Sequence, residues 1–317
     1  MSLTRDDVLY AYRLILGREP ENEEVIEQTM QAESLAHLRR VFMGSAEFAS
    51  KYAGAKRALP VGRFSEADRV DVDLACTPEQ LQAMFDRIGT AWQAFGESEP
   101  HWSVLSSDDY LQAHLPENVD RFFRRGELEV DIHLNALRRA GLSTRFGRVL
   151  DFGCGVGRLT LALSPQADQV IGVDISPPHL RLAEERASQV GIANVLFEAI
   201  AAIDDLDRYR GFDLVISLIV LQHNPPPVMA ALYARLLAAL APGGVAIVQM
   251  PTFIKDRSFS TTDYLANEQP QMEMNALPQH HVFDIVDAAG CRVVEVREDV
   301  AAGDMPALSH TFVVRKL

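Results

Sequence analysis

Short apolar runs alternate with helical stretches over the second half of the chain, which indicates an α/β fold. Runs rich in Val, Ile, Leu and Phe lie near residues 148–153, 169–174, 194–199, 212–217 and 244–249. The stretches between them have apolar positions at helical spacing, which predicts a parallel sheet with helices on both faces. Two final apolar segments, 291–296 and 310–315, have no helix between them. We therefore expect these two segments to pair antiparallel.

The N-terminal part has a different pattern, with helical spacing only. Thr4 and Asp7 form a capping box before an apolar stripe that stops at Gly17, and two more helical stretches follow in 22–32 and 34–43. This predicts a small all-α domain ahead of the α/β domain. We place the boundaries at 1–55 for the helical domain, 56–76 for a linker, 77–145 for a helical cap segment, and 146–317 for the α/β domain, as listed here in chain order.

Three alternate glycines, Gly153, Gly155 and Gly157, follow the first predicted strand and open the next helix. Glycine allows a positive φ angle and the close approach of a ligand to the main chain. The spacing differs from the G-x-G-x-x-G of dinucleotide sites, and Asp151 precedes the first glycine by two residues. A carboxylate there repels a pyrophosphate but can receive an ammonium group. The turn therefore predicts a cationic, phosphate-free ligand.

The second predicted strand ends in Asp174, 21 residues after Gly153. This distance is one βαβ step, at which an acidic side chain meets a ribose diol. We interpret Asp174 as the residue that binds a ribose.

At this point the chain resembles the class I S-adenosylmethionine-dependent methyltransferases. The turn and Asp174 are followed in order by 212–223, similar to the family's fourth strand and loop, and by 240–248, similar to its turn into the fifth strand. The resemblance implies a Rossmann-like seven-stranded sheet with the last strand antiparallel, and S-adenosylmethionine as cofactor. The cofactor-binding residues that it implies are Asp151, Gly153, Cys154, Gly155, Gly157, Arg158, Asp174, Ile175, Ser217 and Leu218.

The N-terminal residues 9–20, completed by 45–48, resemble a bacterial domain of unknown function that is similar to phycobilisome linker repeats. The resemblance implies that residues 1–55 dock a protein partner. A helical cap without a partner is the alternative.

The acceptor side of the site is less defined. His223, in the loop after the fourth strand, is the candidate general base, although it could instead cap the next helix or pack under the loop; His280 and His281 are weaker candidates. Residues 251–277 form the longest insertion and are expected to build the acceptor pocket. Among aromatic residues, Trp102, Phe122 and Phe123 could face a sulfonium or fill a core.

A histidine in the loop after the fourth strand, together with the lack of zinc or thiolate ligands, favours O-methylation of a small molecule or a glycan. The alternatives are an N-methyltransferase, an aminopropyl-type transferase, or a cofactor-binding scaffold that docks partners through its N-terminal helices. After deletion of residues 1–60, retained turnover with loss of partner capture would support separable docking, whereas a folded but inactive protein would implicate the helices in the active site.

The net charge, the hydropathy and the cysteine spacing exclude several classes of binding partner. The net charge is −14, and all of it arises after residue 63, because the first 63 residues hold nine basic and nine acidic side chains. Such acidity disfavours nucleic acids and anionic membranes, and the chain has no apolar run of membrane-spanning length. Cys76, Cys154 and Cys291 lack metal-site spacing, so no metal is expected. We expect a cytoplasmic bacterial protein.

Overall fold

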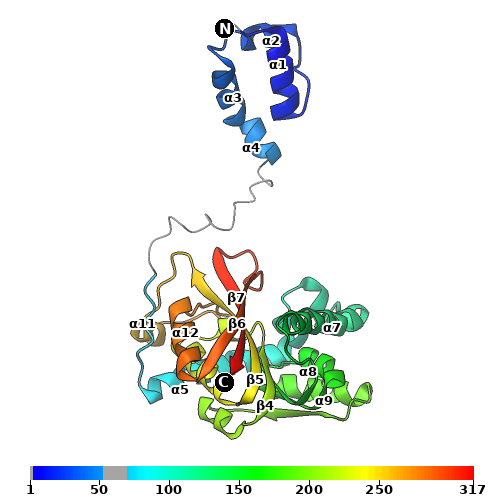
Figure 1. The fold of residues 1–317 in the computed structure, drawn as a ribbon, viewed down its shortest axis with the longest axis vertical. Helices are drawn as coiled ribbons and strands as arrows, with labels where there is room; N and C mark the ends of the chain where they lie inside the picture. The colour runs from blue at the N-terminus through cyan, green and yellow to red at the C-terminus, as the bar shows by residue number, and fades with distance from the viewer. Residues whose placement is uncertain (1–2, 53–69) are drawn as a thin grey trace. The chain divides into compact units, whose positions relative to one another are not determined.

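The computed structural model describes residues 3–52 and 70–317, which form two separate compact units. In the first unit, capping of the first helix by Thr4 is confirmed, and Gly17, with φ of +62°, ends the π-helical turn that continues it. The helical segments of this unit (Figure 1) are α1 (Arg5–Ala11), η1 (Tyr12–Leu16), α2 (Glu23–Thr29), α3 (Leu35–Met43) and α4 (Ala46–Tyr52). Apolar residues from α1, η1, α2 and α3 share a core that includes Val8, Leu16, Ile26 and Leu38.

The second unit is built on one seven-stranded sheet. Its strand order is β3-β2-β1-β4-β5-β7-β6, in which β1 to β5 are parallel and β7 runs antiparallel to both of its neighbours. The predicted fold class and the antiparallel final pair are therefore confirmed. The strands are β1 (Phe146–Phe152), β2 (Ala167–Asp174), β3 (Val195–Ala199), β4 (Phe212–Ser217), β5 (Leu240–Ile254), β6 (Cys291–Asp299) and β7 (Ala307–Lys316).

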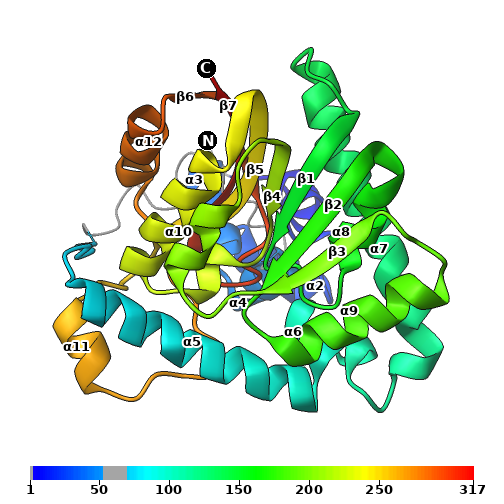
Figure 2. The ribbon, with the colours of Figure 1, turned by 90° about the horizontal axis from the view of Figure 1, so that it is seen from below.

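Helices cover both faces of this sheet (Figure 1, Figure 2). One face packs against α7 and α8, and the other against α5, α10 and α12, each through its own apolar cluster. The helical segments of this unit are α5 (Pro78–Ser98), α6 (Pro100–Val104), η4 (Asp108–Tyr110), α7 (Leu115–Arg139), α8 (Arg158–Leu163), η5 (Ser164–Gln166), α9 (Pro177–Gln189), η6 (Ile203–Arg208), η7 (Leu221–His223), α10 (Pro226–Ala238), α11 (Thr261–Ala266) and α12 (Gln279–Ala288).

Two boundaries differ from the expected ones. The fifth strand runs from Leu240 to Ile254 rather than 244–249, because β7 pairs with it as far as Ile254. The insertion before α12 is correspondingly shorter and contains α11. The predicted linker 56–76 lies outside the described residues as far as 69. Its last part belongs to the second unit, where the N–H of Asp73 donates to the carbonyl of Phe259 and the N–H of Phe259 donates to the carbonyl of Asp71, both at 3.0 Å.

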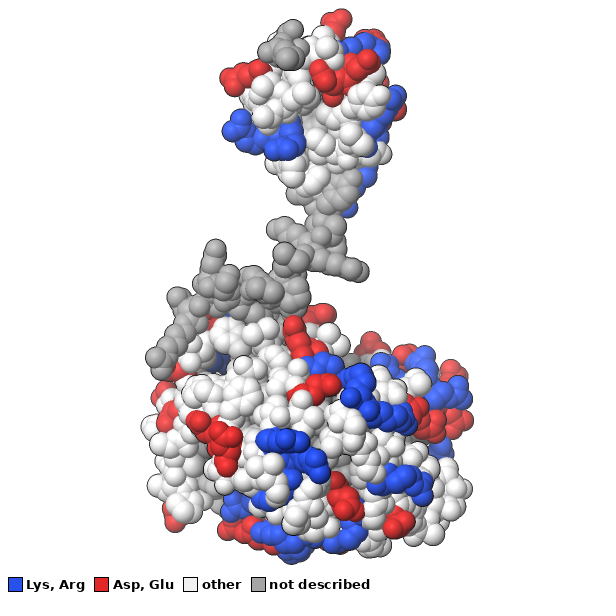
Figure 3. Space-filling view, in the orientation of Figure 1, with Lys and Arg blue, Asp and Glu red and all other residues white. Residues whose placement is uncertain are grey.

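Surface charge on the face drawn in Figure 3 is mixed. Acidic and basic side chains of the second unit are interspersed there. That face therefore presents no continuous basic patch of the kind that binds a phosphate backbone. Within residues 3–52 and 70–317, no helix is both long and apolar enough to cross a membrane.

Candidate active site

A cavity with an empty volume of about 770 Å³, part of it open to solvent, lies at the carboxyl ends of β1, β2 and β4. This is the point where the strand order changes direction, and open α/β sheets bind ligands there. Phe85, Ile88 and Trp92 of α5, with Ser103 and Val104 of α6, cover the cavity.

The glycine turn follows β1 as expected. Besides ligand approach, the packing of neighbouring side chains also requires glycine at these positions. Gly153, Gly155 and Gly157 have φ angles of +74°, +53° and +79°. A Cβ on Gly153 would lie 2.3 Å from Val220 Cγ2, and one on Gly155 would lie 2.7 Å from Val104 Cγ2. The close approach that glycine permits here is therefore that of two covering side chains, and not only that of a ligand.

The N–H groups of the turn are used within the protein. Those of Gly153 and Cys154 donate to the carbonyl of Val173, at 2.7 and 3.1 Å, and that of Gly157 donates to the carbonyl of Cys154 at 2.9 Å. A phosphate site needs such groups to point at the ligand. Their internal use supports the prediction of a ligand without phosphate.

Asp174 is the carboxylate at the end of β2, and it is only 9% exposed. Its Oδ2 accepts a hydrogen bond from the N–H of Gly155 at 2.8 Å, and its Oδ1 accepts one from the N–H of Ser176 at 2.9 Å. These two bonds fix the carboxylate against the wall of the cavity. Each oxygen retains acceptor capacity for a hydroxyl group.

Asp151 is the deeper carboxylate, 1% exposed at the end of β1. Thr160 donates a hydrogen bond of 2.6 Å to its Oδ2. Burial raises the pKa of Asp151 from its ordinary value of 3.8 to about 6, although the bond from Thr160 and the charge of Arg158 oppose the rise. A buried carboxyl of this kind gains from a cationic partner.

Arg158 begins α8 and also lines the cavity. Its Nη1 donates to Glu129 of α7 at 2.6 Å, while its buried Nε has no hydrogen-bond partner. The side chain is fixed by α7 because Gly126 lets that helix pack onto Arg158: a Cβ on Gly126 would lie 2.5 Å from the Arg158 carbonyl oxygen.

His223 lies in η7 and is 5% exposed, with its ring 5.2 Å from that of Trp92. Its Nδ1 bonds the carbonyl of Glu273 at 2.7 Å. Since a carbonyl can only accept, Nδ1 carries the proton and Nε2 carries the lone pair. Burial lowers the pKa of His223 to about 4, so the ring is neutral at pH 7.

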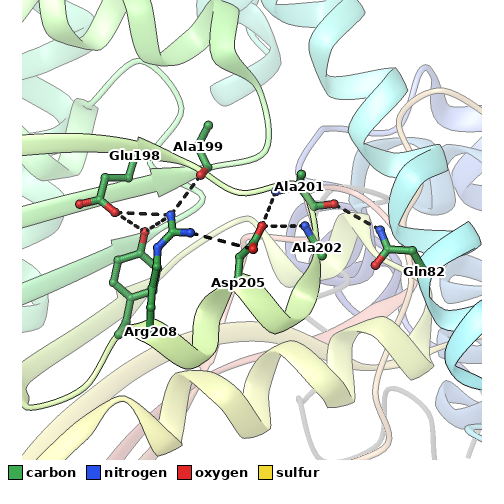
Figure 4. Close-up of polar contacts among 8 residues, drawn as sticks. Gln82, Glu198, Ala199, Ala201, Ala202, Asp205 and Arg208 are labelled. Atoms are coloured by element: carbon green, nitrogen blue, oxygen red, sulfur yellow. Dashed lines mark hydrogen bonds and ion pairs between the residues drawn. The ribbon is translucent and has the colours of Figure 1, made fainter.

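Acidic groups in β3 and after it are engaged in local contacts (Figure 4). Asp205 accepts from the N–H groups of Ala201 and Ala202, at 2.8 and 3.0 Å, and Glu198 accepts from Arg208 and Tyr209. Gln82 of α5 donates to the carbonyl of Ala201 at 3.2 Å. These contacts hold the segment that follows β3 against η6 and α5.

The cavity unites most of the residues expected to bind the cofactor and adds others. Those that line it are Asp151, Gly153, Cys154, Gly155, Arg158, Asp174, Ile175 and Leu218. Gly157, Ser217 and His223 lie near it but are not among its lining residues. Lining residues that the sequence analysis missed are Phe85, Ile88, Trp92, Ser103, Val104, Phe152, Leu159, His179, Ile219, Val220 and Asn224.

The three aromatic residues considered for contact with a sulfonium, Trp102, Phe122 and Phe123, are not among the residues that line the cavity. Phe122 is fully buried in a small cluster with Tyr110, and Trp102 packs on Phe95 at 6.2 Å between ring centroids. The aromatic residues that line the cavity include Phe85 and Trp92, seven residues apart on α5, and Phe152 of β1. The positions 85, 88 and 92 have helical spacing, which on its own indicates only a buried face.

The sheet order, the glycine turn and the acid at the end of β2 define the fold of the class I S-adenosylmethionine-dependent methyltransferases. Residues 149–244 match the family described as a methyltransferase domain. The match covers less than a third of the chain, and S-adenosylmethionine is the cofactor of this class, as the sequence analysis expected.

Curated relatives agree with this class. The chain is 32% identical over 179 residues to a ubiquinone biosynthesis O-methyltransferase of Psychrobacter cryohalolentis, covering 54% of this chain and 62% of that protein. It is 38% identical over 126 residues to a trans-aconitate 2-methyltransferase of Methylobacterium nodulans, covering 39% of this chain and 45% of that protein. The chain thus spans about half the length of the curated relatives it matches.

Among solved structures, the chain is similar to a magnesium protoporphyrin IX methyltransferase from Synechocystis with bound S-adenosylmethionine. The TM-score is 0.50 at 18% identity, and the match covers 73% of this chain and 97% of that one. At this identity the likeness shows the fold.

Proposed function

We propose that this protein transfers the methyl group of S-adenosylmethionine to an oxygen atom of a small organic acceptor. The observation that carries the proposal is the pair of buried carboxylates, Asp151 and Asp174, at one wall of a largely apolar cavity. This arrangement fits the cofactor, which has an ammonium group and a ribose diol but no phosphate. The names of the two curated relatives, one an O-methyltransferase, support the same activity.

The bound cofactor supplies an electrophilic methyl group on a positively charged sulfur. In this proposal Asp151 pairs with the ammonium group, and Asp174 accepts hydrogen bonds from the ribose while Gly155 and Ser176 hold it in place. The helices α5 and α6 cover part of the cavity and shield that part from solvent. Alignment of two reactants in a closed site supplies roughly 7–11 kcal/mol of rate enhancement.

His223 is the proposed general base. Its neutral ring has the lone pair on Nε2, because Glu273 fixes the proton on Nδ1. With a pKa of about 4 it is a weak base, which cannot readily take the proton of an alkyl hydroxyl. We therefore favour a phenol, whose proton is more acidic, or a carboxylic acid, which is already ionised at pH 7 and needs no base, over an alkyl hydroxyl of a glycan; only the phenol would use His223. An amine acceptor, and thus N-methylation, would be the alternative outcome.

The first unit, within residues 1–55, is proposed to dock a protein partner. Tyr10 and Leu14 are 60% and 79% exposed and lie four residues apart, which places them on one helical face. This face offers apolar contact area that the unit's own core does not use.

The cofactor part of the proposal is tested by calorimetry with S-adenosylhomocysteine. Asp174→Ala is expected to weaken binding at least tenfold, because each hydrogen bond to a carboxylate contributes roughly 1.5–3 kcal/mol. Asp168→Ala removes an exposed carboxylate from the same strand and should leave binding unchanged. Equal affinity of both variants would refute the role of Asp174.

The acceptor is identified by transfer of a labelled methyl group into a cell extract, followed by mass determination of the product. An O-methyl ester or aryl ether is the expected product. A labelled amine would replace O-methylation by N-methylation, and no labelled product of any kind would contradict the proposed activity.

A further inference from the structure

Ile219 has a backbone conformation that β-branched residues rarely adopt. Its φ angle is +61°, and it lies between Leu218 and Val220, which line the cavity with it. In the left-handed region the Cβ of an L-residue crowds the following carbonyl oxygen, so this conformation persists only where the surroundings hold it. The shape of the cavity wall at Ile219 therefore depends on the contacts that stabilise its positive φ angle.

The side chain of Gln249, on β5, makes that contact. It is 2% exposed, and its Oε1 accepts a hydrogen bond of 2.8 Å from the N–H of Ile219. Its Nε2 donates to Gln222 Oε1 at 3.0 Å and to Ser309 Oγ at 2.7 Å. The amide orientation follows from these partners, because the N–H of Ile219 can only donate. The two bonds of Nε2 thus keep Oε1 directed at Ile219.

The held conformation determines where the next residue lies. Val220 packs directly over the glycine turn, so closely that a Cβ on Gly153 would lie 2.3 Å from Val220 Cγ2. After it, Asn224 Nδ2 and the N–H of His223 donate to the carbonyl of Val220, at 3.0 and 3.1 Å. Residues 218–220 are therefore held next to the glycine turn by two sets of hydrogen bonds: one from Ile219 to Gln249, and one from His223 and Asn224 to the carbonyl of Val220.

We propose that Gln249 is a positioning residue of the cofactor site. It acts through Ile219, because it is not itself among the lining residues of the cavity. By holding Ile219 at positive φ it sets the distance between residues 218–220 and the glycine turn. This inference rests on the proposed function, since it assumes that the cavity binds S-adenosylmethionine.

The test is a double-mutant cycle read out as affinity for S-adenosylhomocysteine, with thermal unfolding measured in parallel. Gln249→Met keeps the length of the side chain but removes the acceptor for Ile219, and we expect it to weaken binding about tenfold, in line with the strain at a β-branched residue of positive φ. Adding Ile219→Gly should restore most of the affinity, because glycine adopts this conformation without strain.

Ser309→Ala is the matched control. It removes one hydrogen bond from the same network without touching Ile219, so it should lower the melting temperature and change the affinity by less than the Gln249 variant does. A purely structural role of Gln249 would make the two variants behave alike.

The outcomes are distinguishable. If the unaltered protein does not bind S-adenosylhomocysteine, the proposed function falls. If it binds and Gln249→Met binds equally well, or if Ile219→Gly does not restore a weakened affinity, the positioning role of Gln249 is refuted while the proposed function stands. If Gln249→Met does not fold, recovery of folding and binding in the double variant supports the inference, and no recovery overturns it.

Discussion

Replacing Asp151 by Asn should make the empty protein more stable while it weakens cofactor binding. The carboxyl is fully buried, and its hydrogen bond from Thr160 can be kept by the amide oxygen of Asn. What the substitution removes is a charge that the empty site does not neutralise well. Active sites commonly store such an unfavourable charge, because the ligand compensates it.

The size of the effect follows from the pKa. Burial raises the pKa of Asp151 from 3.8 to about 6, and one pKa unit corresponds to about 1.4 kcal/mol, so ionised Asp151 destabilises the empty fold by about 3 kcal/mol. The sign depends on pH. Below about pH 4 the carboxyl is protonated in the folded and the unfolded chain, and the penalty is absent. It grows as pH rises through 4 to 6 and is complete above 6.

Urea unfolding at pH 4.5 and pH 8 measures this difference. Asp151→Asn should gain up to about 3 kcal/mol over the unaltered protein at pH 8 and much less at pH 4.5. Asp168→Asn, an exposed carboxyl on the neighbouring strand β2, is the control and should change stability little at either pH.

Calorimetry with S-adenosylhomocysteine gives the second half of the test. At pH 8 the Asn variant should bind at least tenfold more weakly, because the ligand's ammonium group loses its charged partner. The affinity of the unaltered protein should also fall as pH drops below about 6, and that of the variant should not. A variant that is no more stable at pH 8, or one that binds as tightly as the unaltered protein, would refute this role of Asp151.

Two further predictions concern the acceptor side and the first unit. His223→Ala should lower turnover at saturating cofactor by roughly a hundredfold without changing the affinity for S-adenosylhomocysteine. The control, His280→Ala, is at a partly exposed position of α12 and should change neither turnover nor affinity. Unaltered turnover in His223→Ala would show that His223 takes no part in the chemistry. Deleting residues 1–52, which have an apolar core of their own, should preserve methyl transfer and abolish capture of a protein partner. A folded but inactive remainder would instead place the first unit in the active site.

The parts of the fold that are encoded locally could be predicted from the sequence. The glycine turn, the acids at 151 and 174 and the capping box at Thr4 each depend on residues within a few positions of one another. The length of β5 could not be predicted, since its last residues are ordered by pairing with β7 more than fifty positions later.

The covering wall of the cavity could not be predicted for the same reason. Trp92 faces His223 across 131 positions of sequence, and the spacing of the apolar residues on α5 shows only that one face of that helix is buried. Likewise, Ile219 has no local feature that indicates a positive φ angle. That conformation arises from the side chain of Gln249, on another strand.

The insertion before α12 connects the acceptor side to the cofactor side. Glu273, 4% exposed, accepts hydrogen bonds from Tyr264 and Asn275, and its carbonyl holds His223. The N–H of Asn275 donates to the carbonyl of Gln222 at 2.7 Å, and the side chain of Gln222 bonds Gln249. The proposed base and the residue that holds the cofactor wall thus belong to one hydrogen-bonded network. Breaking one hydrogen bond of a buried network can cost more stability than that bond contributes by itself. Substitutions of Glu273 should therefore lower both turnover and cofactor affinity, whereas a substitution of His223 alone should lower turnover only.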